Sequence, residues 1–494
     1  MGEDIDRTEF SAEHRALFQR RLRENLAALK GLLARPGFGT GPPSIGAEVE
    51  LYLIGRDSCP LPCNQELLAG AADPRIALEL NRFNLEYNLT PVPAAGRPFS
   101  SLETELCAAL ASLNRHAASL GGRVIPIGIL PTLRRRDFGP GAMTPLPRYE
   151  ALTRSLQRLR GEHFAIRIGG PEPVSLEADD VTLEGANTSF QVHLRVEPSA
   201  FARTFNALQL VTPLMLAISC NAPLLFGRRL WHETRVPLFK LAVDSRDRDS
   251  RALHLPPRVH LGTGWVREGV YELYAAAVHL HEPLLPIPTR ENAIARLRTG
   301  RVPSLRELRL HQGTIWPWNR PVYDPSDGGH LRIEMRALPA GPSAVDMCAS
   351  AAFGLGLAVA LRERIDDLLP ACPFAIAEEN FYRAAQHGHE ALLFWPGAEG
   401  VLERRPAPEL ALELLPVALR GLVRLGVARA EAARYLEVVR ERVERRTSGA
   451  AWQLRQLDRL QPRLGRAGAL RRLVDGYAEH ALANRPVSEW PDIP

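Results

Sequence analysis

Short segments in which apolar and polar residues alternate predict β-strands, and segments with helical spacing predict helices. The predicted strands lie at 47–53, 84–89, 123–129, 188–196 and 331–338. The predicted helices lie at 8–34, 100–120, from about 147, 198–219, 343–369 and from about 400 onward, and the Pro- and His-rich middle, 250–320, reads as irregular. Strands of a parallel sheet covered on both faces are usually continuously apolar, so the alternation favours an antiparallel α+β fold.

The division of the chain follows from these patterns. We expect an N-terminal helix and linker over 1–44, a main domain over 45–399 and a helical C-terminal region over 400–494. The length would also fit about three domains of roughly 150 residues each.

Side chains two residues apart on a strand share one face, and four predicted strands each carry polar groups at that spacing. The pairs are Glu48 with Glu50, Glu86 with Asn88, Gln191 with His193, and Glu334 with Arg336. One interpretation is the wet face of a half-exposed sheet. However, glutamates at the centres of three strands would repel one another unless cations lay between them. Carboxylate oxygens are the ligands that magnesium prefers, so we expect Mg²⁺ at Glu48, Glu50, Glu86 and Glu334.

The charge pattern narrows the class of protein. The net charge is +5 with a pI of about 9.0, and arginine supplies almost all of the positive charge because Lys30 and Lys240 are the only lysines. This bias reflects either codon usage or an anionic ligand, whose oxygens arginine binds bidentately. No basic run is interleaved with aromatic residues, so we do not expect nucleic-acid binding. The oligomeric state stays open.

The cellular location is expected to be the cytoplasm. The six cysteines are scattered, which is typical of a reduced protein, and the acidic start contains no apolar stretch, so we expect no signal peptide. The most apolar window, 208–226, is interrupted by polar residues and prolines, and we expect a buried helix there and no membrane span.

Three smaller patterns each allow two interpretations. Cys59 and Cys63 form a redox-regulated pair or are two unrelated loop thiols. Trp316 and Trp318 wall an acceptor pocket or only pack. Four histidines resemble a metal cluster but fit no zinc spacing, so surface or core histidines are the simpler interpretation: His254, His260, His279 and His281.

The usual nucleotide-binding loops are absent from the sequence. No Gly-x-x-x-x-Gly-Lys-Ser/Thr segment occurs, and the glycine-rich stretch at 37–41 precedes a strand where such a loop would follow one. A nucleotide site in this chain would therefore be built from metal ions and arginines on a sheet.

Seven segments resemble the glutamate–cysteine ligases of the plant and proteobacterial type, and they keep their order over about 45–345. The opening strand at 45–50 resembles the family's Gly-x-Glu-x-Glu. The other six are 84–88, the Arg-Tyr at 148–149, 189–194, the Asn-Ala-Pro-Leu loop at 221–224 with Gly227 and Arg235, 311–317, and 331–337.

The resemblance implies a glutamine-synthetase-like curved sheet and an acyl-phosphate mechanism that uses ATP. On that model the four glutamates hold Mg²⁺, and the 45–399 segment is catalytic. Arg235 and Arg336 would clamp carboxylate or phosphate, and Gln191, His193 and Arg320 would bind the nucleotide or a metal ion. The product would be γ-glutamylcysteine, from glutamate and cysteine, on the route to glutathione.

Departures from the family pattern fall in the segments where the amine acceptor would be recognised. His193 replaces an Asn, the segment 337–342 lacks an expected Asp, and 316–320 differs from Phe-Pro-Glu-Val-Arg apart from Arg320. The acceptor could therefore be another amine, such as an amino acid, a polyamine or a peptide. A non-catalytic relative that binds nucleotide or amino acid and regulates a partner is the third interpretation.

Overall fold

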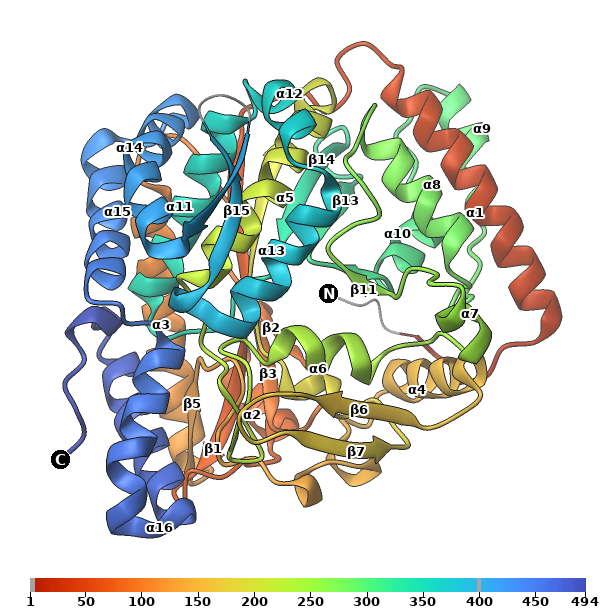
Figure 1. The fold of residues 1–494 in the computed structure, drawn as a ribbon. Helices are drawn as coiled ribbons and strands as arrows, with labels where there is room; N and C mark the ends of the chain where they lie inside the picture. Colours follow the sequence, from red (N-terminus) through yellow and green to blue (C-terminus); the bar gives the residue numbers. More distant parts are fainter. Residues whose placement is uncertain (1–4, 398–400) are drawn as a thin grey trace.

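The computed structural model describes residues 5–397 and 401–494. An antiparallel sheet with the order β13–β14–β8–β1–β3–β2 lies at its centre, and β4 and β5 also pair with β1 (Figure 1). Its strands are β1 (Ser44–Gly55), β2 (Ile76–Leu78), β3 (Asn84–Asn88), β4 (Val92–Pro93), β5 (Gly122–Ile125), β8 (Phe190–Val196), β13 (Asn319–Asp324) and β14 (His330–Met335). The predicted antiparallel α+β fold with a curved sheet is confirmed.

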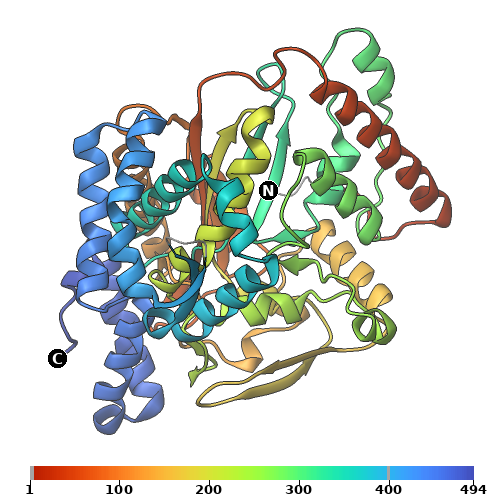
Figure 2. The same ribbon diagram turned by 45° about the horizontal axis from the view of Figure 1, so that its top comes forward.

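Helices surround this sheet (Figure 2). The longer ones are α1 (Ala12–Leu33), α3 (Pro98–Ser119), α4 (Pro147–Arg160), α5 (Phe201–Ala217), α8 (Val270–Leu280), α11 (Ala344–Leu361), α13 (Phe374–His387), α14 (Ala407–Leu425), α15 (Arg429–Glu444) and α16 (Gly449–Leu482). The shorter ones are α2 (Asn64–Ala71), α6 (Arg235–Ala242), α7 (Arg248–Ala252), α9 (Ala293–Arg298), α10 (Arg306–Gln312) and α12 (Ile365–Leu368).

The apolar face of the sheet is covered by α5 and α11. A Cβ on Gly354 of α11 would lie 2.5 Å from Sδ of Met215 in α5 and 3.1 Å from Cε of Met335 in β14. The next layer is equally close, because a Cβ on Gly421 of α14 would lie 1.8 Å from the carbonyl oxygen of Gly356. Helix α11 is apolar and long enough to cross a membrane, but 89% of it is buried inside the protein. It is the central core helix.

The N-terminal helix packs at the other side of the molecule, against α8, α9 and α10 (Figure 1). The predicted helix buries Phe18, Leu22, Leu26 and Leu29, and Ser11 caps it by accepting from the backbone N–H of His14. These contacts contradict the expectation of an irregular 250–320 segment. Its prolines separate helices too short to show a clear period in sequence.

Short two-stranded pairs were also missed. They are β6 (Phe164–Ile168) with β7 (Val174–Ala178), β9 (Leu224–Leu225) with β10 (Arg228–Arg229), the parallel pair β11 (Val259–His260) with β12 (Trp316–Pro317), and β15 (Leu392–Pro396) with β16 (Leu402–Pro406). Strand β16 lies where the sequence showed only helix, because its charged, partly exposed residues carry no alternation. The rest of the C-terminal region is helical, as predicted.

Candidate active site

The register of the central sheet brings the predicted glutamates together. Glu50 of β1 lies opposite Glu86 of β3, and Glu48 lies opposite Gln191 of β8. His193 of β8 lies in turn opposite Glu334 of β14. Since residues opposite one another in antiparallel strands point to the same face, all six side chains share one side of the sheet.

Two groups of possible metal ligands form on this face. Glu48, His193 and Glu334 make one group, and Glu50, Glu79 and Glu86 make the other; within each group the ligand atoms lie within 4.8 Å of one another. These donor sets fit hard divalent cations such as Mg²⁺. Oε2 of Glu48 is buried without a hydrogen-bond partner among the described residues, as expected of an oxygen that would bind a cation.

His193 is placed as a ligand would be. Its Nε2 lies 3.1 Å from Oε1 of Glu48, but neither ring nitrogen has hydrogen-bond geometry to a partner among the described residues. Both side chains are buried. An imidazole held this way can offer a lone pair to a cation shared with Glu48 and Glu334.

Two arginines hold the fully buried Glu334. Arg320 donates through Nε to Oε2 at 2.6 Å and through Nη2 to Oε1 at 2.9 Å, and Arg336 donates to Oε1 at 2.5 Å. Burial alone would raise the pKa of Glu334, but the attraction of both guanidinium groups holds that pKa well below its usual range. Arg336 also donates to Gln191, whose amide donates to Glu50 at 3.0 Å. The two groups of ligands are thus joined by one hydrogen-bond network.

A cavity of about 230 Å³ opens onto the first group of ligands. Glu48, His193 and Glu334 line it together with four arginines: Arg148, Arg309, Arg320 and Arg332. Guanidinium groups facing a cavity bind phosphate oxygens bidentately. We call this the arginine cavity, and its charge suits a polyphosphate.

The second group of ligands consists of carboxyl groups alone. Burial, supplemented by repulsion among the carboxylates, raises the pKa of Glu50, Glu79 and Glu86 to about 7 each. Burial and the charges of Glu79 and Glu50 raise the pKa of the neighbouring Glu184 to about 8. The folded protein therefore holds protons here that the unfolded chain releases near pH 4.5.

A dependence of stability on pH and metal follows. From about pH 4.5 to about pH 8 the unfolded chain binds fewer protons at these carboxyls than the folded protein, so their contribution to metal-free stability should fall as the pH rises through 7 and level off above about pH 8. Above pH 6.5 the buried histidines add nothing to this pH dependence, because burial lowers the pKa of His260 and His311 from 6.5 to about 4 and both are then neutral in the folded and the unfolded chain. Mg²⁺ binds the deprotonated carboxylates and should raise the melting temperature more at pH 8.5 than at pH 7. Calorimetry with EDTA or MgCl₂ measures both; equal Mg²⁺ effects at the two pH values would contradict a carboxylate metal site.

Three residues near the site were not among the predicted site residues. Glu79 follows β2, and the alternation of Leu78, Glu79 and Leu80 could have revealed it. Arg148 belongs to the resembling Arg-Tyr pair but was given no role. Glu184 lies in a one-turn 3₁₀ helix (Glu184–Ala186) after β7, and a lone acid in a loop gives no sequence signal.

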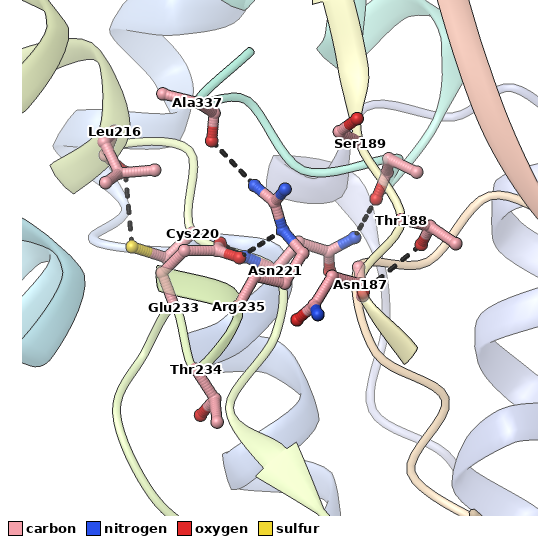
Figure 3. Close-up of polar contacts among 12 residues, drawn as sticks. Asn187, Thr188, Ser189, Leu216, Cys220, Asn221, Glu233, Thr234, Arg235 and Ala337 are labelled. Atoms are coloured by element: carbon pink, nitrogen blue, oxygen red, sulfur yellow. Dashed lines mark hydrogen bonds and ion pairs between the residues drawn. The ribbon is translucent and has the colours of Figure 1, made fainter. Parts of the chain in front are cut away.

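The structure corrects the prediction that Arg235 clamps substrate. Its side chain is 2% exposed; Nε donates to Oε1 of Glu233 at 2.6 Å and Nη2 to the carbonyl of Ala337 at 2.6 Å. Figure 3 shows this ion pair beside Asn221, whose backbone N–H donates to Glu233 at 2.9 Å. These contacts make Arg235 a structural residue that ties its loop to the chain just after Arg336.

Packing contacts account for Trp318 and the histidines, while the two interpretations of the cysteine pair stay predictions. All six cysteines are free thiols, and burial raises the pKa of both Cys59 and Cys63. Trp318 is buried, with its ring 5.4 Å from that of Phe381. The rings of His260 and His281 stack 6.4 Å apart, and none of the four candidate histidines joins a metal-binding group within the described residues.

Comparison with known proteins agrees with the geometry. The model of "Glutamate-cysteine ligase family 2" matches residues 44–476, most of the chain. The chain belongs to this family. It is accordingly an ATP-dependent carboxylate–amine ligase, and the resemblance drawn from its sequence is confirmed.

Two relatives illustrate the match. A Rubrobacter xylanophilus protein named as a candidate glutamate–cysteine ligase 2-3 is 29% identical over 459 residues, which cover 90% of this chain and 98% of that protein. The glutamate–cysteine ligase of Francisella tularensis, solved in complex with AMP, superposes with a TM-score of 0.55 at 11% identity over 90% of this chain and 91% of that one. The second likeness confirms the glutamine-synthetase-like fold of these ligases.

Proposed function

We propose that this ligase joins the γ-carboxylate of glutamate to an amine through an acyl phosphate, at the expense of ATP. The observation that carries the proposal is the pair of carboxylate groups on one sheet face, with the arginine cavity beside one of them. The family and the AMP complex of its Francisella relative support a nucleotide in that cavity.

Each of the two groups of ligands would hold its own cation. Glu48, His193 and Glu334 would hold one cation, and Glu50, Glu79 and Glu86 another. When bound, such cations neutralise phosphate oxygens and favour in-line transfer. Arg320 and Arg336 are fixed by Glu334, so they need no rearrangement as negative charge develops on the transferring phosphoryl group.

The bonds change in two steps. A γ-carboxylate oxygen of glutamate attacks the γ-phosphorus of ATP, the bond to the β,γ-bridging oxygen breaks, and ADP leaves. The amine nitrogen then attacks the acyl carbon, phosphate leaves with the bonding electron pair, and the nitrogen releases a proton. The family name points to cysteine as the amine, and a cytoplasmic location stays a prediction.

Hydroxylamine gives a test that does not depend on the natural amine. With Mg-ATP and glutamate it should yield ADP and γ-glutamyl hydroxamate, because a small nucleophile intercepts an acyl phosphate. The measurement is ADP release with mass spectrometry of the product. Release of ADP that is independent of glutamate, or no hydroxamate despite ATP binding, would contradict the proposal.

A further inference from the structure

A second, much wider cavity lies on the other side of the N-terminus of α4. Its volume is about 970 Å³, at the upper end of the roughly 300–1,000 Å³ of pockets that bury a drug-sized ligand. The 135–147 segment, α4, β7 and the 226 turn supply its walls. Its main apolar lining is Phe138, Met143, Leu146, Leu176, Leu183 and Phe226. We call it the wide cavity.

At three places the wall of the wide cavity adjoins residues near the sheet face that carries the two groups of ligands. The hydroxyl of Thr144, in its wall, donates to the carbonyl of Glu79 at 2.6 Å. Leu183 lines it, and the next residue, Glu184, interacts electrostatically with the second group of ligands. At the start of α4, Pro147 lines the wide cavity while Arg148 lines the arginine cavity. Consecutive residues at the start of α4 therefore line the two cavities.

Charge distinguishes the two cavities. The arginine cavity presents four guanidinium groups and three carboxylates, while the wide cavity presents four carboxylates and two arginines. Both of those arginines are engaged: Arg154 pairs with Glu9 and Glu150, and Arg135 donates to the carbonyl of Ser175. The carboxylates that remain at the rim disfavour phosphate and favour an ammonium group.

The acidic side chain next to the wall of the wide cavity is unpaired. The side chain of Glu184 is half-buried and makes no hydrogen bond or ion pair with any residue in the described ranges 5–397 and 401–494. Glu184 follows Leu183 of the cavity wall without lining the cavity itself, so a cation at that wall would lie near this acidic group.

The apolar walls are held in place. Phe226 has a φ of 53°, in the left-handed region that a bulky residue seldom adopts. Its ring meets that of Phe138 edge-on at 5.8 Å, and Phe138 meets Phe83 edge-on at 6.0 Å. Such a row of aromatic side chains suits a bulky apolar group and would leave a large void around a side chain as small as that of cysteine.

We propose that the wide cavity binds the acceptor, and that the acceptor is a primary amine with a bulky apolar group whose ammonium end faces Glu184. This inference rests on the proposed ligase function and adds the class of amine to it. Aromatic or long aliphatic amines and apolar amino acids are the compounds of this class.

The test compares amines in ADP release with Mg-ATP and glutamate, using 2-phenylethylamine, phenylalanine, cysteine and methylamine. We expect kcat/KM for the better of the two aromatic amines to exceed that for cysteine and methylamine by at least about tenfold, as loss of an apolar contact typically costs. Equal or higher kcat/KM for cysteine overturns the inference while leaving the ligase function intact. If even hydroxylamine gives no ADP, the ligase function fails first.

Variants of Leu176 locate the effect in the wide cavity. Leu176→Trp should raise the KM for the aromatic amine about tenfold by filling space, and should leave hydroxamate formation unchanged. Ser175→Trp is the matched control, because Ser175 is the exposed neighbour on β7 and does not line the cavity. Hydroxamate formation also shows that each variant is folded. A raised KM for ATP with an unchanged KM for the amine would assign the wide cavity to the nucleotide and overturn the inference.

Discussion

Replacing Glu86 by Gln is expected to reduce ligase turnover by roughly 10³-fold or more while stabilising the metal-free protein at pH 8. Turnover falls because the change removes a negatively charged oxygen from the second group of ligands. Stability rises because burial and the charges of Glu48 and Glu79 already raise the pKa of this carboxyl to about 7. Glutamine keeps the oxygen that accepts from Asn88 at 2.9 Å, so the local hydrogen bond can persist.

The two effects are measured separately. ADP release with glutamate and hydroxylamine reports turnover, and thermal unfolding in EDTA reports stability. If the Glu86 carboxylate served only to stabilise the fold, its neutralisation would destabilise the protein. A lower melting temperature with normal turnover would therefore contradict the role assigned to Glu86.

Glu334→Gln supplies a contrast on the same face. It should lose turnover and also stability, because Arg320 and Arg336 would be left buried without their counter-charge. Glu379→Gln is the matched surface control. Glu379 forms an exposed i,i+4 pair with Arg383, and such pairs contribute about 0–1 kcal/mol, so neither turnover nor stability should change appreciably.

The strand-borne part of this site could be predicted from sequence because a strand has a fixed period of two. Glu48 and Glu50 must share a face wherever the strand lies, and an antiparallel partner adds its own alternate residues to that face. The register that places Glu50 opposite Glu86 depends on the packed sheet, so sequence gave the residues of the face but not the two separate groups.

Residues outside the strands could not be assigned in this way. Glu184 and most of the wide cavity's lining outside α4 lie in loops and a short hairpin, where position depends on distant contacts and not on a period. Arg235 shows the opposite error. It matched a family motif, but sequence does not reveal that Glu233, two residues earlier, takes up its charge inside the core.

Arg235→Met is expected to destabilise the protein by about 3–5 kcal/mol, the usual cost of removing one partner from a buried ion pair. Glu233 has no exposed surface, and burial raises the pKa of its carboxyl even though Arg235 attracts the charged form. The change would leave that carboxylate unpaired, remove the donor to Ala337 and loosen the chain next to Arg336. Urea unfolding followed by circular dichroism measures the loss.

A second variant separates the ion pair from a role in substrate binding. Glu233→Gln combined with Arg235→Met removes both charges and should recover much of the stability, because no uncompensated charge remains in the core. Below its melting temperature the double variant should also keep the wild-type KM for glutamate in hydroxamate formation. A double variant with restored stability but a KM raised tenfold or more would show that Arg235 binds substrate after all. The wild-type KM would instead leave Arg320 and Arg336 as the arginines of the reaction.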